Sequence, residues 1–171
     1  MGSCCSRKTL ANCFSKDTCL GACVYKTIFS PAYAKILDNL YIGNYTAGEK
    51  VLQNKEPITH IISFIPTDDD LKLEYEEAKI SYHEYLFPDS PDEDIIKHFF
   101  AIKPLIEEIL INQEGKLLLH CSAGASRSVS LGLLILMEYY HYNFNQAYEL
   151  IDDKRFVMIN EGFYDRLKIY K

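Results

Sequence analysis

Residues 117–128, Leu-Leu-Leu-His-Cys-Ser-Ala-Gly-Ala-Ser-Arg-Ser, are the stretch that decides the fold of this chain. The leucines at its start predict a short buried strand, and the apolar pattern from Val129 to Tyr140 predicts a buried helix after it. A loop of small residues between a strand and a helix N-terminus exposes free backbone N–H groups and the positive end of the helix dipole. The stretch therefore predicts a binding site for an anion.

Cys121 follows the predicted strand directly and would lie at the floor of this anion site. The side chains of Ala123, Gly124 and Ala125 are small enough to let successive backbone N–H groups surround phosphate oxygens. Arg127 adds a planar guanidinium that can grip two oxygens of one phosphate. Cysteines in such surroundings ionise near neutral pH, and the thiolate is the nucleophilic form. We therefore predict that Cys121 attacks a bound phosphate ester.

These residues carry a resemblance to a known family. His120-Cys121-x5-Arg127-Ser128 resembles the HCxxGxxRS signature loop of Cys-dependent protein phosphatases, and the flanking pattern resembles their small, atypical dual-specificity group. Leu40–Gly43 (LYIG) is similar to the strand that opens such catalytic domains. Residues 155–163 resemble the closing R-x-x-x-x-N-x-x-F stretch, with Ile in place of the usual Pro before the Asn. The resemblance covers roughly residues 36–170.

The resemblance implies an α/β fold with a central, mostly parallel sheet of about five strands flanked by helices. It implies that Cys121 is the nucleophile, that Asp89 is the general acid and later the base, and that Ser128 donates a hydrogen bond to the departing thiolate. It needs no metal or cofactor. The phosphate would be held by the loop residues Ser122, Ala123, Gly124, Ala125, Ser126 and Arg127.

The general acid has two candidates in the sequence. The segment 87–94 holds two prolines and four carboxylates that compete for the role. The family pattern selects Asp89, with Asp92 as the alternative because loop geometry cannot be read from sequence. Asp94 is expected to cap the helix that follows.

The resemblance also implies the substrates: phosphotyrosine and phosphoserine or phosphothreonine in proteins, with a signalling kinase as a possible partner. Two alternatives stay open. Phosphoinositide or other non-protein phosphatases are one, although the phosphoinositide enzymes of the superfamily place Lys inside a loop that here has none. A phosphopeptide-binding pseudophosphatase is the other, although such relatives replace the Cys that this chain keeps.

Hydrophobic patterning predicts the remaining elements. One strand is expected to run from Ile36 to Ile42, and two further strands over residues 58–65 and 80–87. Helices are expected over residues 46–54, 71–79 and 95–110, with Pro104 bending or splitting the last. Asn145 is expected to cap a helix near the C-terminus.

The N-terminal segment 1–34 is expected to be a separate Cys-rich tail ahead of a catalytic domain at residues 35–171. Gly2 lies in an N-myristoylation pattern, and Cys4 and Cys5 are candidates for palmitoylation. Two such signals would attach the chain to the inner, cytoplasmic face of a membrane. A metal site is the alternative interpretation of the further tail cysteines, Cys13, Cys19 and Cys23.

Composition narrows the function further. The chain has 171 residues and a formal net charge of −6, which argues against nucleic acid as a partner. No apolar run reaches the roughly 18 residues that suggest a membrane span, and no secretory signal is recognisable. Five of the six cysteines lie in the tail, so a reducing cytoplasm suits the sixth, Cys121, as a working thiol.

Overall fold

The computed structural model describes residues 30–112 and 115–170. Its strands form one five-stranded sheet in the order β1-β2-β5-β3-β4. β1 is antiparallel to β2, and the other neighbouring pairs are parallel. The predicted mostly parallel sheet is therefore confirmed. The strands are β1 (Tyr33–Leu37), β2 (Leu40–Gly43), β3 (His60–Ser63), β4 (Ser81–Glu84) and β5 (Leu117–His120).

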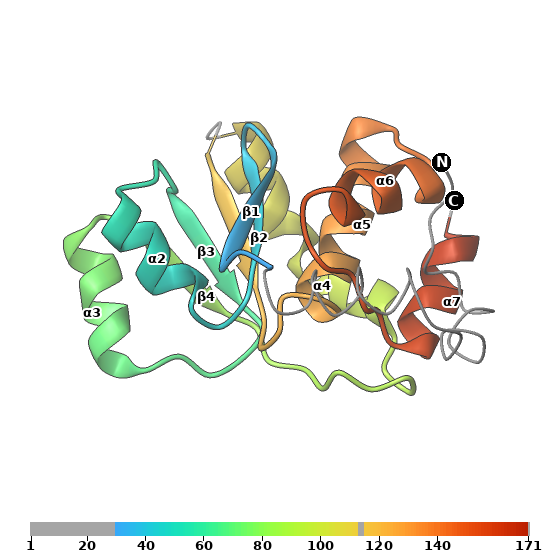
Figure 1. Cartoon of the computed structure of the whole chain (residues 1–171), viewed down its shortest axis with the longest axis horizontal. Helices are drawn as coiled ribbons and strands as arrows, with labels where there is room; N and C mark the ends of the chain where they lie inside the picture. Colours follow the sequence, from blue (N-terminus) through green and yellow to red (C-terminus); the bar gives the residue numbers. More distant parts are fainter. Residues whose placement is uncertain (1–29, 113–114, 171) are drawn as a thin grey trace, which may run out of the picture.

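Helices cover both faces of this sheet. Helices α2 and α3 lie on one side and α4, α5, α6 and α7 on the other (Figure 1). No helix in the described ranges is long and apolar enough to cross a bilayer. The bounds are α2 (Ala47–Asn54), α3 (Asp69–Glu77), α4 (Ile95–Glu107), α5 (Arg127–Tyr140), α6 (Phe144–Asp152) and α7 (Glu161–Ile169), with a π-helical turn η2 (Glu108–Asn112) after α4.

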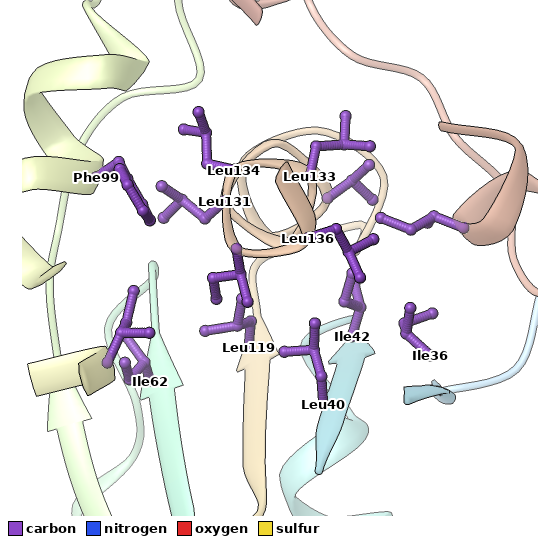
Figure 2. Close-up of a cluster of buried hydrophobic side chains, with 14 of the residues drawn as sticks. Ile36, Leu40, Ile42, Ile62, Phe99, Leu119, Leu131, Leu133, Leu134 and Leu136 are labelled. Atoms are coloured by element: carbon purple, nitrogen blue, oxygen red, sulfur yellow. The ribbon is translucent and has the colours of Figure 1, made fainter. Parts of the chain in front are cut away.

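The larger core lies between the sheet and α5. Figure 2 shows Ile42 and Leu119 on the face of the sheet that α5 covers, with Ile42 next to Leu136 of this helix. The residues from 128 to 136 are all buried, as the sequence predicts for a central helix. Each fully buried aliphatic side chain of this kind contributes about 1.5–3 kcal/mol. The start of α5, where the predicted site lies, is therefore firmly anchored.

The single strand predicted from Ile36 to Ile42 is wrong. The structure has a hairpin there, with β1 and β2 paired from Tyr33↔Gly43 to Leu37↔Leu40. Asp38 and Asn39 form the two-residue turn between them, and both residue types favour turns. The hydrophobic pattern continues on both sides of so short a turn, and therefore does not reveal it.

The helices differ from the predictions at the start of α6 and at Pro104, and agree with them at the start of α4. Asn145 is not the cap of α6; Asn143 is, and it forms a capping box with Gln146 in which each side chain bonds the other residue's backbone. Helix α4 continues through Pro104 to Glu107 and changes to π-helical hydrogen bonding only afterwards. Asp94 caps α4, as predicted.

The carboxyl ends of the parallel strands meet at one edge of the sheet, where open α/β sheets bind ligands. The N–H of Cys121 donates to the Gly43 carbonyl at the end of β2 (3.3 Å). On the other side, the N–H of Phe64 after β3 donates to the His120 carbonyl (2.9 Å). The loop after β5 is therefore held between the loops that follow β2 and β3.

Candidate active site

The signature loop, residues 121–127, connects β5 to α5. Backbone bonds hold it on both flanks: the N–H of Tyr45 donates to the Ser122 carbonyl (3.0 Å) and the N–H of Met158 to the Ala125 carbonyl (2.9 Å). Gly124 has a φ of +67°, and a Cβ there would overlap the Gly43 carbonyl. Only glycine fits this position, for conformational and steric reasons alike.

The loop leaves its own donors free. Within residues 30–112 and 115–170, none of the consecutive backbone N–H groups from Ser122 to Arg127 donates to a protein acceptor. Ser126, the N-cap residue of α5, makes no side-chain cap bond. Unpaired N–H groups of this kind, at the start of a helix, favour an anionic ligand.

Cys121 lies at the end of β5 and is only 1% exposed. Its Sγ is 3.3 Å from the Oγ of Ser128, which is itself fully buried in the first turn of α5. The Ser128 hydroxyl also lies 3.5 Å from the Gly43 carbonyl. Ser128 is therefore placed to donate a hydrogen bond to a sulfur anion, the geometry that its predicted role requires.

Arg127 links the signature loop to two neighbouring loops. Its Nη1 donates to the carbonyl of Phe64 (2.8 Å) and to that of Phe87 (3.2 Å). Its Nε lies 3.8 Å from the Oδ2 of Asp89 and has no hydrogen-bond partner in the described ranges. Part of the guanidinium is therefore fixed by the protein, and part of it remains available to a phosphate.

Asp89 lies against the signature loop, although 32 residues of sequence separate it from Cys121. Its Oδ1 accepts hydrogen bonds from the Ser126 hydroxyl (2.7 Å) and the Asn160 side-chain amide (2.6 Å). The structure shows no bond between the Asp92 carboxylate and any described residue of that loop. The geometry therefore favours Asp89 over Asp92 as the acid.

The comparisons with known proteins agree with this arrangement. A family model described as "Dual specificity phosphatase, catalytic domain" matches residues 40–171. The chain belongs to this family.

Similar proteins include dual-specificity phosphatases. Dual specificity protein phosphatase MPK-4 of Drosophila melanogaster is 34% identical over 137 residues, which are 77% of this chain and 34% of the relative. Human dual specificity protein phosphatase 26 is 37% identical over 93 residues, 54% of this chain and 44% of that protein. The chain thus spans between a third and a half of these relatives. The structure of human tyrosine phosphatase-like serine/threonine/tyrosine-interacting protein aligns with a TM-score of 0.66 at 29% identity, covering 80% of this chain and 93% of that one.

The Asp89 loop of this phosphatase domain is supported from the α4 side as well. The ring of His98 stacks on Phe87, with 4.1 Å between the ring centres. The His98 Nε2 lies 2.9 Å from the Glu93 carboxylate, beyond Asp89 in sequence. His98 therefore contacts the chain on both sides of Asp89 and limits how far this loop can move.

Three contributions to the phosphatase site were missed by sequence reasoning. Ser126 was predicted only as one of the loop residues that hold the phosphate, yet its hydroxyl also donates a hydrogen bond to Asp89. Asn160 caps α7 by accepting from the N–H of Phe163 (2.9 Å), which turns its NH₂ group toward Asp89. Arg155 is 3% exposed and donates to the carbonyl of Ile42. The closing R-x-x-x-x-N stretch was the available signal for the last two.

His120 precedes the predicted nucleophile and is 2% exposed. Both of its ring nitrogens lack a hydrogen-bond partner in the described ranges. Burial lowers the pKa of His120 to about 4, so the ring is neutral at physiological pH. It therefore adds no charge beside Cys121. The predicted lipidation residues Gly2, Cys4 and Cys5, and the other tail cysteines, lie outside the described residues.

Proposed function

We propose that this dual-specificity phosphatase domain hydrolyses phosphotyrosine and phosphoserine or phosphothreonine in proteins through a cysteinyl-phosphate intermediate. One observation carries the proposal: the unpaired N–H groups from Ser122 to Arg127 border Cys121, with the Asp89 carboxylate at the same loop. An anion site, a nucleophile and a proton donor are what phosphate-ester cleavage requires.

In the first step, the loop N–H groups and Arg127 bind the phosphate of the substrate. The Cys121 sulfur attacks phosphorus, an S–P bond forms, and the P–O bond to the leaving group breaks. Asp89, in its protonated form, gives its proton to the departing phenol or alcohol oxygen. Positioning and charge stabilisation by the loop supply most of the rate acceleration.

In the second step, the Asp89 carboxylate takes a proton from water, and the resulting hydroxide attacks the cysteinyl-phosphate. The S–P bond breaks, inorganic phosphate leaves and the Cys121 thiolate is restored. Ser128, 3.3 Å from the sulfur, donates a hydrogen bond to that thiolate as it departs. No residue outside this loop and the Asp89 segment handles a proton in this scheme.

The test is turnover by the full chain in reducing buffer on three substrates: a phosphotyrosine peptide, a phosphothreonine peptide and a soluble phosphoinositide. We expect both peptides to be hydrolysed faster than the phosphoinositide. A faster phosphoinositide reaction would support a lipid substrate instead. Tight peptide binding without turnover would indicate a phosphopeptide-binding module, and inactivity on all three would contradict the proposal.

We also propose that the physiological partner is a phosphorylated protein, with signalling kinases as the candidate class. A pull-down with the Cys121→Ser chain tests this, because the variant keeps the loop N–H groups and Arg127 but lacks the nucleophile. We expect it to retain phosphorylated proteins that inorganic vanadate releases. Equal capture in the presence of vanadate would contradict binding through the active site.

For the tail, we propose acylation at Gly2 with palmitoylation at Cys4 or Cys5, and attachment to the inner face of a membrane. The sequence pattern M-G-S-C-C-S supports it, because a single acyl chain binds reversibly and needs a second signal. In cells, Gly2→Ala should move the chain from the membrane fraction to the soluble one. Unchanged partitioning of this variant would contradict the hypothesis.

A further inference from the structure

Arg155, between α6 and α7, is a buried cation that the proposed mechanism does not use. Its Nη1 donates to the carbonyl of Ile42 near the end of β2. Its Nη2 lies close to Gly124: a Cβ added to that glycine would overlap this nitrogen. Its Nε has no hydrogen-bond partner in the described ranges. The guanidinium therefore occupies the space between β2 and the signature loop.

Within residues 30–112 and 115–170, no ion pair joins Arg155 to an Asp or Glu. Burial lowers the pKa of Arg155 to about 10, so the group is still charged at neutral pH. The charged group that favours its protonated form is Cys121. A buried guanidinium without a counter-charge is strongly unfavourable. The Cys121 thiolate can supply this negative counter-charge.

We propose that Arg155 is the counter-ion of the Cys121 thiolate and positions the charged nucleophile in the free enzyme. The proposal rests on the proposed role of Cys121 as the nucleophile. The strand order supports it: β5, which ends at Cys121, lies between β2 and β3. Arg155 bonds the chain at β2, whereas Arg127 bonds the chain after β3 and β4. The two guanidinium groups therefore bond the chain on opposite sides of β5, the strand that ends at Cys121.

The two arginines then differ in function. Arg127 is partly exposed and is the proposed ligand of the substrate phosphate, whereas Arg155 is only 3% exposed, with its Nη2 beside Gly124. Arg155 therefore keeps the thiolate charged before substrate arrives. The other groups near Cys121 supply less positive charge: His120 is neutral, Ser128 is a hydroxyl, the loop N–H groups carry only partial charges, and the Arg127 guanidinium lies beside the Asp89 carboxylate.

The test is the pH dependence of Cys121 alkylation by iodoacetamide in the full chain, in buffers without phosphate or sulfate. Mass spectrometry of the peptide that contains Cys121 separates it from the tail cysteines. In Arg155→Met, we expect the midpoint of the alkylation profile to rise by about one pH unit, because a neighbouring opposite charge favours the ionised form by at least that much. Alkylation at pH 6 would then be about tenfold slower than in the wild type. Arg155→Lys, which keeps the charge, should shift less than half as far.

Lys154→Met is the matched control. It removes a positive charge one residue away, but the Lys154 Nζ donates to the carbonyls of Lys35 and Ile36 in β1, away from the loop. Its alkylation profile should equal that of the wild type. An unchanged midpoint in folded Arg155→Met, or an equal shift in Lys154→Met, would overturn the pairing.

A second measurement covers the case in which Arg155→Met does not fold. Cys121→Ser removes the anion and leaves both guanidinium groups without it. In the same buffers at pH 8, its melting temperature should fall several degrees below that of the wild type. An unchanged or higher value would overturn the proposal. Alkylation and melting are read without substrate, so they test the pairing separately from phosphatase turnover, whose absence would contradict the proposed function alone.

Discussion

The signature loop and the Asp89 loop both supply groups to the site, but different forces hold them in place. The signature loop joins a buried strand to a buried helix, and backbone bonds from Tyr45 and Met158 fix its flanks. The Asp89 loop is held by side chains from distant parts of the sequence, namely Ser126, Arg127 and Asn160. The proposed nucleophile, Cys121, is thus positioned by the topology of the backbone, and the proposed acid, Asp89, by a few polar side-chain contacts.

The largest expected effect comes from the nucleophile itself. Cys121→Ser should reduce turnover at least ~10⁴-fold, because removal of a nucleophile disables the whole catalytic group. The loop N–H groups remain, so competitive binding of inorganic phosphate should change less than about threefold, as expected for uniform ground-state binding. Steady-state kinetics measures the loss of turnover, and calorimetric titration with inorganic phosphate measures binding to the wild type and to the inactive variant. Substantial residual turnover in this variant would show that Cys121 is not the nucleophile.

Removing the acid should cost less than removing the nucleophile. Asp89→Asn should lower kcat by about 10²–10⁴-fold, the usual contribution of a general acid or base. The loss should be larger for phenyl phosphate than for p-nitrophenyl phosphate, whose leaving group needs less help from a proton. Asp92→Asn is the matched control from the same loop. If it showed the larger loss, the assignment of the two carboxylates would be reversed.

Acid should lower the free energy of unfolding through His120, the buried residue that precedes the signature loop. The pKa of His120 is lowered from 6.5 to about 4 in the folded protein, so the unfolded chain binds more protons between these values. The stability that depends on neutral His120 is complete above pH 6.5 and is lost as pH falls toward 4. Between pH 7.5 and 5.0, wild type should lose about 2 kcal/mol more unfolding free energy than His120→Gln. Urea titrations at both pH values measure this, and equal losses would contradict it.

The smallest effect should come from Asn160, which connects the acid to the start of α7. Asn160→Ser keeps a good N-cap but loses the NH₂ group that donates to Asp89. We expect kcat to fall about tenfold with little change in KM, as for one hydrogen bond to a charged group. The loss in kcat should be larger for phenyl phosphate than for p-nitrophenyl phosphate, as for Asp89→Asn. A uniform loss on all substrates would indicate a purely structural role.

The difference between the signature loop and the Asp89 loop also explains which parts of the site could be predicted from the sequence. Residues 117–128 determine a strand, a loop and a helix that are contiguous, so local pattern was enough to place Cys121, Arg127 and the free N–H groups. The hairpin turn at Asp38 and Asn39 was missed because hydrophobic residues continue on both sides of it.

Local sequence pattern could not predict the contacts between segments that are distant in the sequence. Asn160 and Arg155 reach the site from the α6–α7 connection, and nothing in their neighbouring residues indicates Asp89 or the signature loop as the partner. Only the family resemblance marked them as noteworthy. The cap of α6 was misplaced by two residues for a related reason, since Asn143 and Asn145 have equal intrinsic preference and the side chain of Gln146 decides between them.

The central claim is that Cys121 forms a covalent bond to the transferred phosphoryl group. Quenching of the full chain with a denaturing detergent at alkaline pH, within its first turnover of a ³²P-labelled phosphotyrosine peptide, tests it most directly, with peptide mapping of the label. We expect label on the peptide that contains Cys121, stable at alkaline pH and lost in mild acid as an S–P bond requires, and none in Cys121→Ser. Turnover that leaves no label on that peptide, or places it on another residue, would contradict the account.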